Sequence, residues 1–278
     1  MCIIRLLCSN LKVTAMREKP MPGQPLTTKE KSRMCLYERM SYYQDQEKDQ
    51  AFNPTNSVLL VRISFKNIRR FSKVFEAPFD FGCFDLMQQT ATYLLNTFKA
   101  KYAHVGVSEI VMVIHGTEKT PLEYGGKKQK LVSAVTSSAS THFSLKLAES
   151  RDIDELYDRG VYPAFDVTIF RVPNRTETGN ALLWAERENT KKCLIAISNS
   201  LGINKDIDNK TFVDRIRIIK EVHKYDWDNI NTKFKNGIYI KRKKIHLEGE
   251  ELSKYVIEIQ SESFTNSSID ERNKRIFG

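Results

Sequence analysis

The spacing of hydrophobic positions changes several times along this chain, and each change marks a secondary-structure element. Nearly continuous apolar runs rich in β-branched residues predict buried strands over residues 58–63, 103–114 and 164–172. Apolar residues at helical spacing predict helices over residues 80–99, 131–148 and 181–201. Asp80 is expected to cap the first of these helices, and Gly202 is expected to end the last.

The C-terminal third continues the pattern. Thr211 is expected to begin a helix with an apolar stripe of Phe212, Ile216, Ile219 and Val222. Residues 238–245 and 255–260 predict a hairpin or two late strands. The alternation of strands and helices predicts an α+β fold in which helices pack on a largely antiparallel sheet. We expect a flexible or targeting N-terminal extension (1–32), a core (33–202), a C-terminal helix and strand portion (203–262) and a loose tail (263–278).

The charge balance bears on partners. The chain has 44 Lys and Arg against 34 Asp and Glu, a formal charge of +10. A basic globular chain without long low-complexity tracts commonly meets a polyanion or an acidic membrane face, and a basic surface without such a partner is the alternative. No apolar stretch approaches the ~18 residues of a membrane span, so no membrane-spanning segment is expected.

Cysteine and histidine usage excludes two further classes. The five cysteines include no C-x-x-C pair and the histidines show no H-E-x-x-H spacing, so neither a disulfide scaffold nor a zinc site is expected. A reducing compartment follows, with the cytoplasm as the expected location. The first 17 residues hold three basic residues and no acid, which is also compatible with a mitochondrial transit peptide or with a start at Met16.

Two short motifs carry the candidate chemistry. They are R-I-S-F-K-N-I at residues 62–68 and G-V-S-E-I-V at residues 106–111. The two segments resemble motifs of the tRNA-histidine guanylyltransferase family, the 3′-to-5′ polymerases, which have the forms R-(I/L)-D-G-(K/R)-x-F and Q-S-D-E-(I/Y)-S. In this resemblance Ser64 and Ser108 stand where the family has its metal-binding aspartates, and Phe65 replaces a glycine.

Later segments extend the resemblance in the same order. They are K-L-V-S at 130–133, F-D-V-T at 165–168, W-A-E-R-E at 184–188 and F-K-N-G at 234–237. Matches run from about Ser57 to Lys241. The resemblance implies a palm-like, ferredoxin-like core such as polymerases and nucleotide cyclases have, and the homo-oligomeric assembly of the family.

The family is understood to activate a tRNA 5′ end and add a nucleotide to it, which implies two magnesium ions held by carboxylates. A serine hydroxyl supplies no charge, and Phe65 is expected to change the loop that a glycine would form. We therefore expect no magnesium site and assign no catalytic residue. Glu109 is the one carboxylate left, and it should point away from Ser108 on a strand, as a structural or surface group.

Basic residues persist around these motifs and are candidate contacts to RNA or nucleotide phosphates: Lys66, Arg69, Arg70, Lys130, Lys235, Lys241, Arg242, Lys243 and Lys244. Phosphate contacts of this kind give affinity without sequence specificity. Solvated lysines along a loop and an edge strand are the alternative interpretation, because lysine there also discourages aggregation.

The sequence thus predicts a divergent, catalytically inactive guanylyltransferase-like protein that binds tRNA or another RNA and needs no cofactor. Two alternatives stay open. One is an active tRNA 5′-end nucleotidyltransferase with relocated metal ligands, which would need Mg²⁺ and GTP or ATP. The other is a non-catalytic scaffold subunit of a larger protein assembly.

Overall fold

The chain is described by a computed structural model over residues 29, 51–71, 74–172, 174–203, 207, 210–246 and 253–278. Apart from Lys29, the expected extension over 1–32 and the first part of the expected core, residues 33–50, lie outside the described residues. Residues 50–278 form one compact unit, and residues 1–49 are assigned to a separate one. Every element discussed below belongs to the unit of residues 50–278.

A six-stranded antiparallel sheet forms this unit, with strand order β4-β1-β3-β2-β5-β6. The strands are β1 (Ser57–Phe65), β2 (Tyr102–Val105), β3 (Glu109–Gly116), β4 (Phe165–Arg171), β5 (Ile238–His246) and β6 (Ser253–Gln260). The first four strands follow the ferredoxin-like order, because each of two crossover helices joins parallel strands that are one strand apart. The predicted α+β class with an antiparallel sheet is therefore confirmed.

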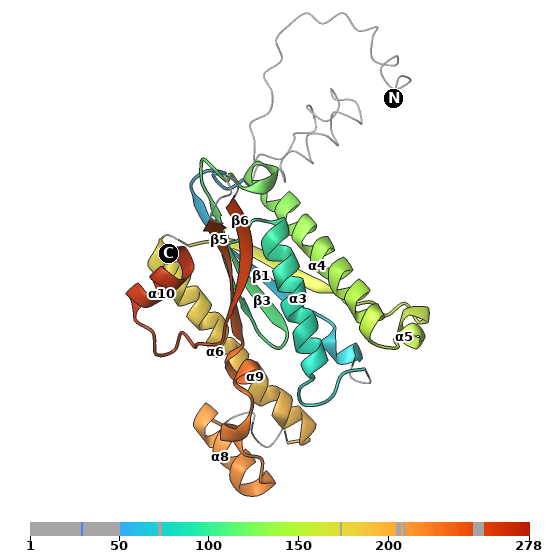
Figure 1. Cartoon of the computed structure of the whole chain (residues 1–278). Helices are drawn as coiled ribbons and strands as arrows, with labels where there is room; N and C mark the ends of the chain where they lie inside the picture. Colours follow the sequence, from blue (N-terminus) through green and yellow to red (C-terminus); the bar gives the residue numbers. More distant parts are fainter. Residues whose placement is uncertain are drawn as a thin grey trace, which may run out of the picture. The chain divides into compact units, whose positions relative to one another are not determined.

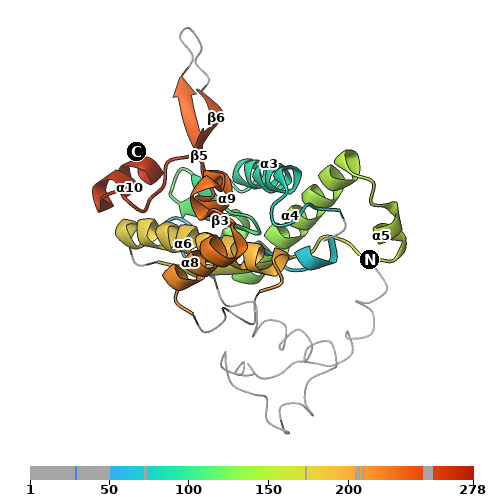
Figure 2. The ribbon, with the colours of Figure 1, turned by 90° about the horizontal axis from the view of Figure 1, so that it is seen from below.

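Helices cover both faces of the sheet. They are α3 (Phe81–Thr97), α4 (Lys128–Ser150), α5 (Asp154–Asp158), α6 (Arg175–Ser200), α8 (Phe212–His223), α9 (Thr232–Asn236) and α10 (Ile269–Phe277), with 3-10 turns η1 (Ile68–Phe71), η2 (Glu123–Gly126) and η3 (Trp227–Asn229). The crossover helices α3 and α4 lie on one face and α6 lies on the other (Figures 1 and 2). Among the described residues, no helix is long and apolar enough to cross a membrane.

Alternation along β1 divides the core into two clusters. Leu59, Val61 and Ile63 pack with the inner faces of α3 and α4, whereas Leu60 packs with Leu182 of α6. Such alternation follows from the two-residue period of a strand. The cap of α3 is also as predicted, since the Asp80 carboxylate accepts a hydrogen bond from the Cys83 amide at 2.7 Å.

The predicted single strand over 103–114 is instead two strands joined by a tight turn. The Gly106 amide donates to the Glu109 carbonyl at 2.8 Å, so the chain reverses between β2 and β3. The continuous apolar run concealed this turn because both strands are buried along nearly their whole length. As a result, β3 begins at Glu109 and Ser108 belongs to the turn.

The C-terminal segment is not the loose tail that the sequence predicted. Phe264 and Ile276 are buried, and α10 begins with a capping box in which Ser268 and Glu271 exchange hydrogen bonds. The buried carboxylate of Glu186 on α6 accepts hydrogen bonds from the Phe264 amide and from the hydroxyls of Tyr239, Ser263 and Thr265. A polar sequence is thus held by a buried acceptor elsewhere in the chain, which local hydrophobicity does not reveal.

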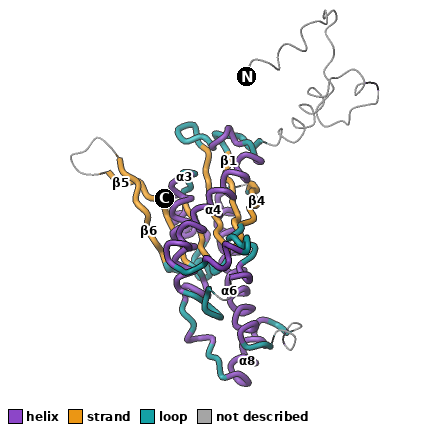
Figure 3. Tube along the Cα trace, turned by 90° about the vertical axis from the view of Figure 1, so that its right-hand side faces the viewer, coloured by secondary structure: helices purple, strands orange, loops and turns teal. Residues whose placement is uncertain are grey.

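Strands β5 and β6 form the predicted hairpin and extend past the rest of the sheet. Strand β2 pairs with β5 only as far as Lys241, whereas β5 and β6 remain paired to His246 and Ser253. We call residues 242–246 and 253–257 the ribbon. Figure 3 shows β5 and β6 diverging from the other strands.

Candidate functional site

The two motif strands bring Ser64 and Glu109 face to face. They are direct cross-strand partners in the β1–β3 pairing, and the Ser64 hydroxyl donates a hydrogen bond to Glu109 Oε2 at 3.1 Å. Glu109 is 6% exposed. Glu109, expected to point away from Ser108 as a structural or surface group, is therefore a buried group that faces Ser64 and not a surface one. The alternation rule applies only within a strand, and Ser108 lies in the preceding turn, where its carbonyl accepts from the Phe65 amide at 2.9 Å.

Two basic side chains neutralise the buried carboxylate. Arg62 Nη2 lies 2.8 Å from Glu109 Oε2, and Lys192 Nζ of α6 lies 2.7 Å from the same oxygen. Arg62 also stacks over the ring of Trp184, with Cζ 4.9 Å from the ring centroid. We call Arg62, Ser64, Glu109 and Lys192 the charge cluster.

The electrostatics of the charge cluster keep Glu109 ionised. Burial raises the pKa of this carboxyl, but the hydrogen bonds and positive charges of Arg62 and Lys192 outweigh burial, so the pKa lies below its usual value. The same hydrogen bond to Glu109 raises the pKa of Arg62. One carboxylate oxygen therefore accepts from three donors, two of them cationic.

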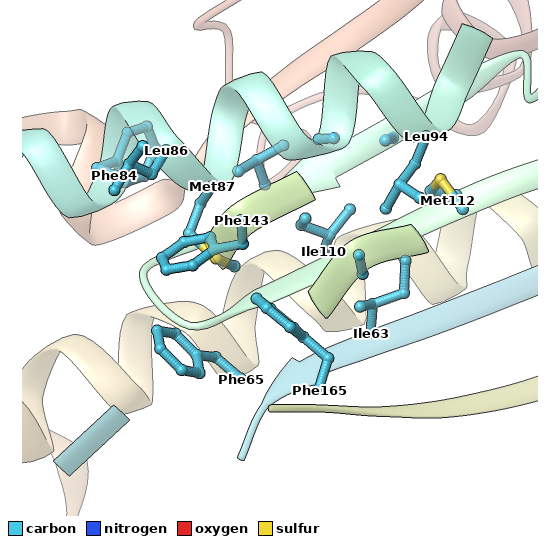
Figure 4. Close-up of a cluster of buried hydrophobic side chains, with 14 of the residues drawn as sticks. Ile63, Phe65, Phe84, Leu86, Met87, Leu94, Ile110, Met112, Phe143 and Phe165 are labelled. Atoms are coloured by element: carbon cyan, nitrogen blue, oxygen red, sulfur yellow. The ribbon is translucent and has the colours of Figure 1, made fainter. Parts of the chain in front are cut away.

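Phe65 contributes to the core rather than to the charge cluster. Its ring lies 5.0 Å from that of Phe165 and 4.9 Å from that of Phe143 of α4. These rings gather beneath α3 in Figure 4. The substitution of phenylalanine for the family's glycine thus fills the opposite face of the sheet, and β1 continues through this position as regular strand.

A second carboxylate stands on the other side of Ser64. Asp166 is its partner in the β1–β4 pairing, and Lys66 Nζ lies 3.1 Å from Asp166 Oδ2. Both side chains are more than 60% exposed. Since β1 separates them, the backbones carrying Asp166 and Glu109 are two strand spacings apart, roughly 10 Å.

A cleft of about 550 Å³ opens beside the charge cluster. Arg69, Ser108 and Lys192 line it together with aromatic side chains that include Phe79 and Phe234. The rings of Phe79 and Phe234 stack with their centroids 4.7 Å apart. The cleft therefore combines cationic groups with a flat aromatic wall.

Buried Asn189 of α6 fixes one edge of this cleft. Its Oδ1 accepts from the Val107 amide at 2.8 Å, and its Nδ2 donates to the carbonyls of Phe234 at 2.8 Å and Lys235 at 3.0 Å. A Cβ on Gly106 would clash with Asn189 Oδ1. The turn that leads into Glu109 and the F-K-N-G segment are thus held by one amide side chain.

The remaining candidate residues lie apart from Glu109. Arg69 and Arg70 are exposed on η1, and Lys130 is exposed on α4. Lys235 Nζ is directed at the carbonyls of Trp227 and Asp228, at 3.4 and 3.3 Å. Arg69 lines the cleft together with Lys192 of the charge cluster, whereas Arg70, Lys130 and Lys235 do not line it.

The four basic candidates on β5 differ in how closely their side chains contact the rest of the protein. Lys241 Nζ donates to the Gly278 carbonyl at 3.1 Å, and the Arg242 guanidinium stacks 3.7 Å above the Tyr255 ring. Lys243 and Lys244 are exposed, with Lys243 Nζ 3.7 Å from a Glu258 oxygen. The ribbon therefore presents cations and one exposed aromatic ring.

Sequence reasoning missed the pairing of Lys192 with Glu109. A signal was present, because Trp184, Glu188 and Lys192 recur every four residues and must share one face of α6. Arg62 is influenced by two of them, stacking on Trp184 and lying in the field of Glu188. Only the packing of α6 on the sheet shows which strand residues this face meets.

The comparisons with known proteins agree on one family. The model of the tRNAHis guanylyltransferase family (Thg1) matches residues 37–173. No curated protein matches the sequence.

Solved structures share the fold at low identity. A bacterial tRNA(His) guanylyltransferase (Thg1)-like protein in complex with ATP has a TM-score of 0.70 at 17% identity, over 88% of this chain and 100% of that one. A GTP complex of a bacterial protein of the same description has a TM-score of 0.62 at 18% identity, over 87% and 96%. The tRNA(His) guanylyltransferase from Saccharomyces cerevisiae has a TM-score of 0.58 at 18% identity, over 72% and 91%.

The charge cluster generates a prediction about stability. Glu109→Gln leaves Arg62 and Lys192 facing each other without their anion, so the free energy of unfolding should fall by about 2–4 kcal/mol at neutral pH. Because the folded pKa of Glu109 is depressed, this stabilisation is present above the unfolded value of about 4.3 and is lost as the pH falls through the folded pKa.

Urea denaturation of both proteins between neutral and acid pH measures the effect. Glu155→Gln is the matched control, since Glu155 forms an exposed pair with Arg159 and its loss should change stability little. Equal stability of Glu109→Gln and the unmodified chain at neutral pH would contradict the assigned role.

Proposed function

Residues 37–173 belong to the tRNAHis guanylyltransferase family, and from this premise we propose that the chain binds tRNA or a related RNA without transferring a nucleotide. The observation that carries the proposal is the charge cluster. The oxygen that faces Ser64 is already occupied by Arg62 and Lys192, both side chains of this chain.

The donor set supports the non-catalytic part of the proposal. Two metal ions about 4 Å apart need carboxylates close enough to be shared between them. Glu109 and Asp166 flank Ser64 on the two strands beside β1, and each carboxylate is paired with its own cations, Glu109 with Arg62 and Lys192 and Asp166 with Lys66. Among the described residues, no three His, Cys, Asp or Glu side chains come together as a metal site. These residues therefore do not fit a pair of magnesium ions.

The charges beside Glu109 also argue against a magnesium ion there. A magnesium ion beside Glu109 would have to displace Lys192 or Arg62. If both stayed in place, the ion would be repelled by them, because the single negative charge of Glu109 is already neutralised. Both cations are themselves about a third exposed, and they are fixed by Trp184 and by α6. The active alternative with relocated ligands would require this arrangement to open.

The basic surface supports the RNA-binding part. The ribbon carries Lys243 and Lys244 beyond the edge of the sheet, with Arg242 stacked on exposed Tyr255. Projecting cations suit phosphate contacts, and an aromatic ring beside them suits stacking on an unpaired base. Arg69 and Arg70 add two exposed cations on η1. A scaffold role in a protein assembly is the outcome to consider if RNA does not bind.

Nucleotide addition is the first test. Purified chain is incubated with monophosphorylated or triphosphorylated tRNA, labelled GTP or ATP, and Mg²⁺ or Mn²⁺. We expect no metal-dependent label at the 5′ end, because the charge cluster leaves no shared carboxylate pair for two metals. Label incorporation that is lost in Glu109→Gln but kept in Glu155→Gln would support the active alternative instead.

RNA binding is the second test, measured as tRNA affinity across a salt series. Lys243→Gln combined with Lys244→Gln should weaken binding and reduce the salt slope by about one unit for each phosphate group that the two side chains no longer neutralise. These two positions are chosen because Lys241 and Arg242 also hold the fold. A charge-matched control combines Lys146→Gln with Arg159→Gln, both exposed on α4 and in the segment after it. Absence of tRNA binding at low salt would refute the proposal.

A further inference from the structure

A second group of basic side chains lies at the opposite end of β3 from the charge cluster. Arg175, at the start of α6, stacks 5.0 Å above the ring of Phe277, and the ring of His115 meets Phe277 edge-on at 5.9 Å. Helix α10, which carries Phe277, lies against α6 in Figure 1. His115 and Glu109 are six residues apart on one strand, a separation of roughly 20 Å. The two groups are therefore independent.

Two lysines complete this group. Lys101 stands between the neighbouring strands, with its amide donating to the Val113 carbonyl at 2.9 Å and its carbonyl accepting from the Arg242 amide at 3.0 Å. Lys241 is adjacent to Arg242 on β5, and its Nζ donates to the Gly278 carbonyl at 3.1 Å. We call Lys101, His115, Arg175 and Lys241 the basic corner.

Lys101 and His115 in the basic corner lack acidic partners. Among the described residues, neither Lys101 nor Arg175 pairs with a carboxylate, and His115 Nδ1 is buried without a hydrogen-bond partner. Burial lowers the pKa of Lys101, and the charges of Arg175 and Lys241 lower it further. Burial also lowers the pKa of His115, with Lys101 and Arg175 acting in the same direction. The neighbouring charges that lower the pKa values of Lys101 and His115 are positive, whereas Lys241 has one acid beside it, its cross-strand partner Glu258.

Neighbouring positive charges of this kind lower the stability of the folded chain unless an anion binds between them. Like charges that are partly removed from water repel one another, and a surface without a ligand would gain stability by separating them or adding an acid. A tetrahedral oxyanion offers several acceptor oxygens to ammonium, guanidinium and imidazole donors, and Arg175 and His115 already share a contact with Phe277.

We propose that Lys101, His115, Arg175 and Lys241 form a binding site for a phosphate group, separate from the charge cluster. The backbone of RNA is the favoured source, because Lys241 joins the basic corner to the cations of the ribbon along a single strand. A free phosphorylated small molecule would satisfy the same donors. The RNA source rests on the proposed function, whereas the phosphate site itself does not.

Thermal melting of the full chain tests the site. Sodium phosphate should raise the melting temperature above that in sodium chloride of equal ionic strength, because a ligand that binds only the folded state stabilises it. Lys101→Gln, Arg175→Gln and their combination should each weaken phosphate binding by about tenfold or more, the loss expected for a charge-assisted hydrogen bond. Arg187→Gln, an exposed arginine on the same helix, should leave the phosphate effect unchanged.

The outcomes distinguish whether the phosphate site exists from which molecule, RNA or a small metabolite-sized ligand, supplies the phosphate group. No phosphate effect in the unmodified chain, or an equal effect in the double variant, refutes the site. A lost phosphate effect together with a shallower tRNA salt slope in the double variant supports RNA as the source. A lost phosphate effect with unchanged tRNA binding supports a small molecule. If the unmodified chain binds no tRNA but keeps its phosphate effect, the proposed function fails and the site stands.

Discussion

The buried ion pairs of Glu109 with Arg62 and Lys192 determine how this unit is arranged. Taking a carboxylate out of water costs several kcal/mol, and the cost is offset only if its partners are close and well oriented. Arg62 comes from the strand beside Glu109, but Lys192 comes from α6 across the sheet face. The position of α6 is therefore coupled to the ionisation of one residue on β3.

Three polar side chains of α6, spaced about one helical turn apart, hold other parts of the chain in place. Glu186 accepts four hydrogen bonds and holds the C-terminal segment, Asn189 holds the turn before β3, and Lys192 completes the charge cluster. Each of the three is buried or half-buried and fully partnered, so the helix has little freedom to rotate. In our account, this rigidity maintains the cationic surroundings of Glu109 in place of a metal-binding geometry.

The sequence allowed β1, β4, the β5–β6 hairpin and the Asp80 cap to be predicted, because these depend on short-range patterns of residues. It did not allow the burial of Phe264 and Ile276 to be predicted. The segment is held through a hydrogen bond from the Phe264 amide to Glu186, 78 residues earlier in the chain, and no local sequence pattern marks that glutamate as a buried acceptor. The contact of Glu109 with Ser64 was not predicted for a related reason. A shift of one residue in where a strand begins reverses the face of every side chain, and an apolar run does not mark that start.

The family resemblance predicted the correct fold, and it directed attention to Ser64 as a candidate position. It did not show that a carboxylate faces that serine, because the comparison placed the motif's aspartate at Ser108 and gave no strand register for Glu109. Only the register of β1 and β3 reveals the facing pair. The basic corner was not predicted either, because its four residues come from separate elements.

Manganese titration followed by electron paramagnetic resonance tests the central claim most directly, since the free hexaaquo ion and a protein-bound ion give distinct signals. If Arg62 and Lys192 neutralise Glu109 as described, Mn²⁺ added at micromolar concentrations to the full chain in the absence of nucleotide should keep the free-ion signal. Tight binding of two Mn²⁺ ions per chain that disappears in Glu109→Gln would contradict the account, because it would show that the carboxylate is available to metal.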